Sequence, residues 1–245
     1  GKSIRDAGVE ADRGVLVFRL AAEEAERLGG ETMPLDIAAP HVGRHGITRR
    51  FPIGPVAGIS PFNFPLNLAA HKVAPALAAG CSIVLKPPSR DPLTMLAVAE
   101  VIDEAGLPEG AVSVLPMSRT LGDRLVEDDR FKLLSFTGSP AVGWAMKARA
   151  GRKPVVLELG GNAGAIVDAS ADLEWAVKRT LVGAFSFAGQ DCICVQRLHV
   201  HEEVWDQYKE RFVAGAARLR QGDPMDPETD LGPMVDDGAV ERTRQ

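Results

Sequence analysis

The feature that most constrains this chain is a repeated alternation of short apolar runs with longer stretches that carry apolar residues at helical spacing. The runs predict strands and the longer stretches predict helices. Strands are expected at 81–85, 111–115, 132–136, 154–158, 164–167 and near 195–200, with helices at 65–79, 92–105, 119–126, 139–149, 171–184 and 202–220. Strands that alternate with helices predict an α/β fold whose mostly parallel sheet has helices on both faces.

The two ends of the chain are less regular. Residues 5–29 predict an amphipathic helix that stops at Gly29-Gly30, and residues 45–60 predict strands broken by turns. The segment 222–233 is acidic and rich in turn residues, and no closing element is predicted after it.

Composition excludes several classes of function. The 245 residues carry a formal net charge of -5, a single Tyr and no run of basic residues, so nucleic-acid binding has no support. No apolar stretch is long enough to span a bilayer. Three sparse cysteines argue against a disulfide scaffold and suit a reducing compartment, so we expect a cytoplasmic protein.

One segment has the form of a phosphate-binding turn. Strand 132–136 runs directly into Thr137-Gly-Ser-Pro-Ala-Val-Gly143, where a helix is expected to begin. Backbone N–H groups and the positive end of the helix dipole at such a turn can bind an anion. The glycine spacing matches neither G-x-G-x-x-G nor a P-loop, so an ordinary strand-to-helix turn explains the segment equally well.

A lysine follows another apolar run, in the segment Leu85-Lys-Pro-Pro-Ser89. The carboxyl end of a parallel strand is where open α/β sheets bind ligands, which makes Lys86 a candidate cofactor contact. The alternative is a solvated loop lysine.

The candidate nucleophile is Cys192, in the segment Phe187-Ala-Gly-Gln-Asp-Cys192 between a predicted helix and a predicted strand. A thiol in a glycine-containing loop can be exposed enough to react, whereas a buried thiol is inert. Cys81 is predicted to be a buried packing residue. Cys194 is left open between a second thiol on the same side and a packing residue.

Two further side chains fit the chemistry of a carbonyl site. Glu158 ends an apolar strand, where partial desolvation would suit general-base work, although a plain surface glutamate is the alternative. The amide of Asn63, in Ser60-Pro-Phe-Asn-Phe-Pro65, could donate to an oxyanion or could simply support a turn. His199 and His201 share a strand face, but no third ligand is in view and no metal site is predicted.

Together these segments resemble the aldehyde dehydrogenase superfamily, which uses NAD or NADP. Five segments match in the expected order: Ser60-Pro-Phe-Asn-Phe-Pro, Leu85-Lys-Pro-Pro-Ser, Phe136-Thr-Gly-Ser-Pro-Ala-Val-Gly143, Leu157-Glu-Leu-Gly-Gly161 and Phe187-Ala-Gly-Gln-Asp-Cys192. The resemblance implies a Rossmann-like cofactor-binding domain over residues 1–157 and the first part of a second α/β catalytic domain over residues 158–245. It also implies a homo-oligomer that binds neither nucleic acid nor a membrane.

The resemblance implies a role for each matching residue. Cys192 would attack a small aldehyde and form a thiohemiacetal, then a thioester. Asn63 and the backbone N–H of Cys192 would hold the oxyanion, and Glu158 would activate the water that releases the acid. Lys86 would bind the adenosine ribose and Ser139 the pyrophosphate. The remaining cofactor-binding positions are Pro61, Phe62, Ser89, Gly138 and Gly143.

Two departures from the family pattern matter. Many NAD-preferring members have Glu where this chain has Ser89, so we expect NADP to be accepted. Members are also about twice as long, so the resemblance implies a central fragment that lacks early strands and a C-terminal part. Such a fragment is expected to expose apolar surface and either to be weakly stable or to associate with other chains. Two alternatives stay open: a CoA-acylating relative, against which Glu158 argues, and a non-catalytic nucleotide-binding fragment.

Overall fold

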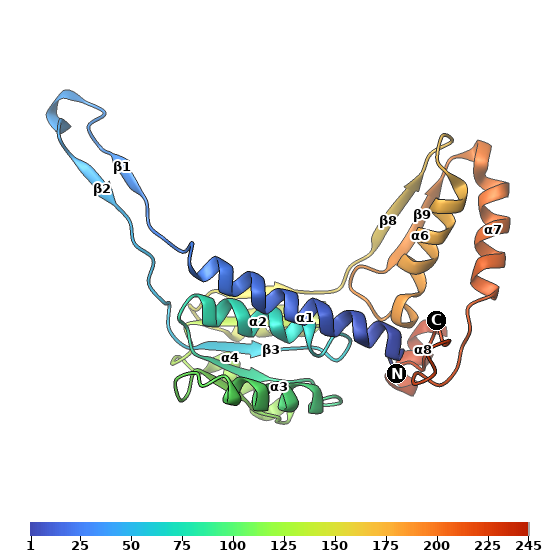
Figure 1. Cartoon of the computed structure of the whole chain (residues 1–245), viewed down its shortest axis with the longest axis horizontal. Coiled ribbons are helices and arrows are strands. Elements are labelled where there is room, and N and C mark those ends of the chain that lie inside the picture. The colour runs from blue at the N-terminus through green and yellow to red at the C-terminus, as the bar shows by residue number, and fades with distance from the viewer. Residues whose placement is uncertain (245) are drawn as a thin grey trace. The chain divides into compact units, whose positions relative to one another are not determined.

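A computed structural model describes residues 1–244, which fold into two compact units (Figure 1). The sheet unit is Ala11–Glu158, and the thiol unit is Gly1–Glu10 together with the residues from Leu159 onward. The family resemblance implies a division between residues 157 and 158, with the first ten residues in the cofactor-binding domain. In the structure these ten residues group with the thiol unit.

The sheet unit is built on five parallel strands: β3 (Val56–Ile59), β4 (Ile83–Lys86), β5 (Val112–Val114), β6 (Leu133–Thr137) and β7 (Val155–Glu158). Their order across the sheet is β5-β4-β3-β6-β7. All four residues of the central strand β3 are buried, as expected for a strand covered on both faces. The predicted α/β class with a mostly parallel sheet is confirmed.

Four helices connect these strands: α2 (Asn67–Ala78), α3 (Leu93–Glu104), α4 (Arg119–Glu127) and α5 (Pro140–Arg149). Helices α2 and α3 carry the chain outward from β3 through β4 to β5, whereas α4 and α5 carry it in the opposite direction to β6 and β7. Because crossovers between parallel strands are right-handed, the two pairs of helices cover opposite faces of the sheet.

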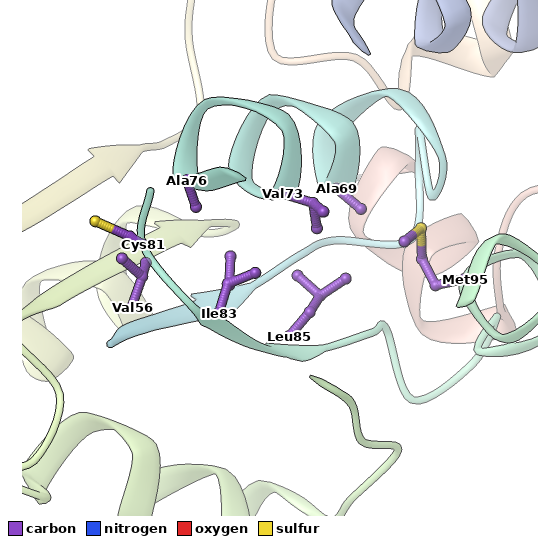
Figure 2. Close-up of a cluster of buried hydrophobic side chains, with 8 residues drawn as sticks. All are labelled: Val56, Ala69, Val73, Ala76, Cys81, Ile83, Leu85 and Met95. Carbon is purple, nitrogen blue, oxygen red and sulfur yellow. The ribbon is translucent and has the colours of Figure 1, made fainter. Parts of the chain in front are cut away.

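The main core lies between α2 and the sheet (Figure 2). Ala69, Val73 and Ala76, which recur at helical spacing, point from α2 toward the strands. They meet Ile83 and Leu85, which alternate on one face of β4 and are 1% and 0% exposed.

The strand order creates a switch point between β3 and β6. The chain leaves β3 toward one edge of the sheet and leaves β6 toward the other. Loops at the carboxyl ends of two such strands part and leave a crevice, which is where open α/β sheets bind ligands. The segments that follow β3 and β6 are therefore the first place to examine for a site.

The thiol unit holds a smaller layer of two parallel strands, β8 (Ala163–Val167) and β9 (Val195–Val200), with helices α6 (Leu173–Phe185) and α7 (Trp205–Ala217). Its core contains Val167, Val177 and Tyr208. The Tyr208 hydroxyl lies 2.7 Å from Oγ1 of Thr180, which satisfies the buried polar end of the ring. A short 3₁₀ helix covers Glu202–Val204, and a turn with non-helical backbone at Phe187 and Ala188 covers Ser186–Gly189.

The structure differs from the sequence prediction mainly at the ends of the chain. Helix α1 runs from Ile4 to Ala25, four residues short of the predicted stop. Strands β1 (Thr32–Pro34) and β2 (His45–Ile47), flanking a 3₁₀ turn at Ala39–His41, form an antiparallel ribbon that was only half predicted. Helix α8 (Asp237–Arg244) was not predicted, although the side chain of Asp236 caps it by accepting from Ala239 N at 2.6 Å. Across residues 1–244, no helix combines the length and apolar character that a membrane crossing requires.

Candidate functional site

Four of the five predicted segments lie at or just beyond the carboxyl ends of neighbouring strands in the sheet unit. Ser60 follows β3, Lys86 ends β4, Thr137 ends β6 and Glu158 ends β7. The register aligns these ends, because Ile59 pairs with Lys86 on one side and with Phe136 on the other, and Thr137 pairs with Glu158. The sheet therefore brings these segments to one edge, at the switch point.

Lys86 and Ser89, two of the predicted cofactor contacts, lie next to each other. Lys86 is buried, 7% exposed, and its Nζ donates to Ser89 Oγ at 3.1 Å and to the Pro87 carbonyl at 3.3 Å. Its stem passes Gly122 of α4, where an added Cβ would lie 3.1 Å from the lysine Cδ. Burial, and then the charge of nearby Arg119, lowers the pKa of Lys86. Lys86 and Ser89 thus form a closely packed pair of hydrogen-bonding side chains, with the positive charge of Arg119 nearby.

The glycine turn after β6 has the geometry of an anion site. Ser139 is the N-cap of α5 but its side chain makes no capping hydrogen bond, and it is exposed. Gly138 N donates to the carbonyl of Glu158 at 3.0 Å, which ties the turn to β7. A side chain at Gly138 would meet the Phe136 ring at 2.5 Å. The turn thus keeps an unshielded helix start at the sheet edge, and Gly143 is buried one turn into that helix.

Asn63 lies half-buried in the loop after β3, beside Pro61 and Phe62, which are also half-buried. Its Oδ1 accepts a hydrogen bond from Phe64 N at 3.1 Å. This contact fixes the oxygen end of the Asn63 amide, and the NH₂ end is the hydrogen-bond donor of the side chain. Just before it, the buried Ser60 hydroxyl has no hydrogen-bond partner among residues 1–244.

Lys72, which is not among the predicted site residues, lies beside the predicted segment that follows β6. It lies on the sheet-facing side of α2, 5% exposed, and its Nζ donates to Thr137 Oγ1 at 2.7 Å and to Ser135 Oγ at 3.2 Å. Its stem passes Gly58 of β3, where an added Cβ would lie 3.6 Å from the lysine Cδ, an ordinary contact distance. Burial lowers the pKa of Lys72 to about 8, partly offset by attraction to Glu158. A lysine amid the apolar residues of α2 was the available signal.

Glu158 departs from its predicted surroundings. The partial burial that was expected for it is wrong, because the residue is exposed. The physical reason is its position: β7 is an edge strand of the sheet, and Glu158 is the last residue of that strand.

Cys192 lies in the thiol unit, on a segment that we call the thiol turn (residues 186–194). Cys192 is exposed, whereas Cys81 and Cys194 are buried. The Cys194 thiol donates to the Ala184 carbonyl at 3.4 Å, and burial raises its pKa, so it is a packing residue. A side chain at Gly161 would lie 2.3 Å from the Cys192 carbonyl oxygen. The Leu-Gly-Gly segment after Glu158 therefore packs directly on the backbone of Cys192.

Among residues 1–244 there is no group of three or more His, Cys, Asp and Glu that could hold a metal ion. Of the two histidines considered as a pair, His199 lies on β9 and His201 lies just beyond its end, where its Nδ1 accepts a hydrogen bond from Glu203 N at 3.3 Å.

A model of the aldehyde dehydrogenase family matches residues 1–245. The 3-sulfolactaldehyde dehydrogenase of Priestia aryabhattai is 42% identical over 246 residues, which cover 100% of this chain and 52% of that protein. The lactaldehyde dehydrogenase of Methanocaldococcus jannaschii is 41% identical, over 96% of this chain and 50% of that protein. The chain thus spans about half the length of these curated relatives.

Solved structures agree. Aldehyde dehydrogenase 21 of Physcomitrella patens, in complex with the reaction product succinate, superposes with a TM-score of 0.95 at 51% identity, over 98% of this chain and 50% of that one. Glyceraldehyde-3-phosphate dehydrogenase of Methanocaldococcus jannaschii, complexed with NADP, superposes with a TM-score of 0.93 at 40% identity, over 99% of this chain and 53% of that one. On sequence and fold together, the chain belongs to the aldehyde dehydrogenase family.

Proposed function

We propose that the protein containing this chain oxidises a small aldehyde to its carboxylic acid with NAD or NADP, through a covalent intermediate on Cys192. The observation that carries the proposal is the exposed thiol of Cys192 on a turn packed against Gly161, in a chain of this family. An exposed thiol whose backbone is fixed by packing is suited to attack a bound carbonyl.

In the first chemical step the Cys192 thiolate forms a bond between its Sγ and the aldehyde carbon. The carbonyl electron pair moves to oxygen, and donors from the Asn63 amide and the Cys192 backbone N–H hold that charge. Removing one such donor typically lowers the rate by about 10² or more. NAD or NADP, held by the residues at the sheet edge, would supply the hydride acceptor for this carbon, so that Cys192 would be left carrying a thioester.

Release of the acid requires water. Glu158 takes a proton from the attacking water, whose oxygen displaces the Cys192 thiolate and frees the carboxylic acid. The exposed position of Glu158 at the end of β7 gives it access to solvent water. A CoA-acylating enzyme would instead give an acyl-CoA, and it would not need this base.

The residues at the sheet edge fit a dinucleotide. Lys86 and Ser89 offer paired donors to the adenosine ribose, and Gly138, Ser139 and Gly143 form the start of α5, which suits a pyrophosphate. Pro61 and Phe62 line the loop after β3. The buried Ser60 hydroxyl adds a polar atom that a ligand at this edge could satisfy.

Acceptance of NADP follows from the charges near Ser89. The neutral hydroxyl does not repel a 2′-phosphate, and Lys86 and Arg119 add positive charge close by. The relatives named for lactaldehyde and 3-sulfolactaldehyde support a small aldehyde that carries a hydroxyl or an anionic group. We also propose that the protein acts as a homo-oligomer.

The first test measures the alkylation rate of each cysteine by peptide mass spectrometry, with and without NADP. We expect Cys192 to react much faster than Cys81 and Cys194, and NADP to change its rate. Equal rates for all three cysteines, unaffected by NADP, would contradict the assignment of Cys192.

The second test is turnover of small aldehydes by the protein that contains this chain, with product analysis. Cys192→Ala should abolish acid formation, whereas Cys81→Ala, at a buried packing position, should retain it. An acyl-CoA product, formed only when CoA is present, would favour the CoA-acylating alternative. Nucleotide binding without any turnover would favour a binding module.

A further inference from the structure

The thiol turn contains a run of left-handed backbone. Phe187, Ala188 and Gly189 have φ values of 48°, 54° and 73°. Glycine adopts this conformation readily, but a phenylalanine and an alanine do so only at a cost in energy. Conformations of this kind persist where the surroundings determine them, and they gather at functional sites. Contacts around Phe187 must therefore hold the turn in place.

The contact beneath Phe187 comes from the other end of the chain, within the same unit. Nζ of Lys2 lies 5.0 Å from the centroid of the Phe187 ring, and it also forms an ion pair with Glu10 of α1. The Lys2 and Glu10 side chains are only 10% and 5% exposed, and Phe187 is 8% exposed. A desolvated cation over an aromatic ring is held more strongly than an exposed one.

The base of this contact is fixed. Ser3 caps α1 by accepting from Asp6 N at 3.2 Å, and Ile4 N donates to the Pro224 carbonyl at 2.7 Å. Arg5 pairs with Asp230 at 3.0 Å. Lys2 is thus presented from an anchored segment, so its contact with Phe187 can restrain the turn.

The far end of the turn is also held. Gln190 Oε1 accepts from Val235 N at 2.9 Å, and its Nε2 donates to the Phe187 carbonyl at 3.2 Å. Between this clamp and the Lys2 contact, residues 187–189 have little freedom to relax. Burial lowers the pKa of Lys2, while Glu10, Asp6 and Asp191 partly offset this and favour its charged form.

We propose that Lys2 and Glu10 form a positioning pair that holds the left-handed thiol turn and so sets the presentation of the Cys192 thiol. The inference rests on the proposed function, in which Cys192 is the nucleophile. Neither Lys2 nor Glu10 touches the reacting atoms in this account. Both act through Phe187.

The test compares Lys2→Met, Lys2→Arg, Glu10→Gln and the double variant Lys2→Met/Glu10→Gln in the Cys192 alkylation assay. Lys2→Met keeps the apolar stem, loses the cation and leaves the Glu10 carboxylate buried without it. We expect its Cys192 rate to fall about tenfold toward that of an ordinary thiol, as the turn relaxes. Lys2→Arg should keep the Cys192 rate close to that of the unmodified chain, since a guanidinium also pairs with carboxylates and stacks on rings.

The matched control is Lys209→Met, which removes a cation 5.9 Å from the Trp205 ring in the same unit. It should leave the Cys192 rate unchanged. The double variant removes both charges, so it should recover part of the rate lost in Lys2→Met. In turnover by the protein that contains this chain, kcat should fall with Lys2→Met while KM for NADP stays the same.

Two results would overturn this inference and leave the proposed function standing. In the first, Cys192 is reactive but its alkylation rate does not change in Lys2→Met. In the second, Lys2→Met lowers the unfolding temperature and raises the alkylation rates of all three cysteines equally. The second would mark general loosening of the fold. If Cys192 of the unmodified chain is no more reactive than Cys81, the proposed function fails, and the inference fails with it.

Discussion

At the scale of single residues, the proposed cofactor site assigns to Ser89 the charge that would face the adenosine ribose. Its hydroxyl lies 3.1 Å from Lys86 Nζ, so a carboxylate placed there would both pair with Lys86 and repel a 2′-phosphate. Like charges about 4 Å apart repel by roughly 1–4 kcal/mol between bulk water and a protein surface. We predict that Ser89→Glu lowers the ratio of kcat/KM for NADP to that for NAD by about tenfold or more.

The control for this change is Ser89→Gln, which has nearly the same size as glutamate but no charge. Steady-state kinetics with both cofactors should show a small effect for Gln and a large one for Glu. Equal effects of the two variants would mean that bulk at position 89, rather than charge, sets the preference.

Lys72 gives the stability of the sheet unit a dependence on pH. Its pKa falls from 10.5 to about 8 in the folded chain, chiefly because the residue is buried. Between these values the unfolded chain holds a proton that the folded chain has released, so stability contributed by this group rises with pH. Below about pH 8 both states are charged, and the folded state bears the full cost of the buried ammonium.

We predict that Lys72→Met removes this dependence. The difference in unfolding free energy between the variant and the unmodified chain should shrink from pH 8 to pH 10.5, by up to about 1.4 kcal/mol per pH unit. Urea unfolding at a series of pH values measures it. Lys147→Met, at an exposed lysine of α5, is the control and should show no such trend. A parallel trend in both variants would refute the assignment to Lys72.

At the scale of elements, the join between the Leu-Gly-Gly segment and the thiol turn is a backbone contact. The Cβ of an alanine at position 161 would lie 2.3 Å from the Cys192 carbonyl oxygen, so one of the two segments must move. Because the obstacle is backbone rather than a flexible side chain, the displacement reaches the nucleophile itself. We predict that Gly161→Ala lowers kcat by about 10² or more, since misplaced reacting groups lose rate steeply.

Gly164→Ala is the matched control, three residues away on β8. An added Cβ there meets only Arg197 atoms at 3.6 Å and beyond, together with His199 at 3.9 Å, which is ordinary contact. It should leave both the Cys192 alkylation rate and kcat close to those of the unmodified protein. If Gly161→Ala behaved like Gly164→Ala, the packing of Gly161 on Cys192 would have no functional role.

Most helices and strands of the sheet unit could be predicted from sequence patterns. Helices α2 to α5 and strands β3 to β7 follow their periodic apolar runs to within a few residues, since burial against one sheet fixes both periods. The parallel class then follows from the alternation. The elements near the N-terminus were harder to predict. Strand β1 is only three residues long, so its strand conformation depends on pairing with β2 rather than on an apolar pattern of its own.

Some residues of the proposed site could also be predicted from the sequence, and others could not. Lys86, Ser89 and the Gly138–Ser139 turn were predictable because they follow strands whose carboxyl ends the topology must bring together. The contacts of Lys72 with Thr137, and of Lys2 with Phe187, join residues far apart in the chain, and no local pattern encodes them. The exposure of Glu158 was mispredicted because an edge strand and a central strand carry similar apolar runs.

At the scale of the whole molecule, the ribbon of β1 and β2 and its flanking residues expose several large apolar side chains to solvent. Ile37, Val42, Ile47 and Phe51 are 89%, 76%, 73% and 76% exposed. A two-stranded ribbon also leaves unpaired backbone groups along its outer edges. Apolar side chains beside open strand edges are features that favour association with another chain.

We therefore predict that the chain, of 26.1 kDa, associates in solution and that the ribbon drives this. Ile37→Ser combined with Ile47→Ser should shift the mass measured by light scattering toward the monomer, because burying each isoleucine contributes about 1.5–3 kcal/mol to an interface. Val213→Ser, at a residue of α7 that is 59% exposed, is the control and should leave the mass unchanged. A monomeric unmodified chain, or equal shifts in both variants, would show that exposed apolar residues of the ribbon have no special part in assembly. A specific shift would instead identify residues 32–51 as an assembly element, distinct from the sheet edge that carries the proposed cofactor contacts.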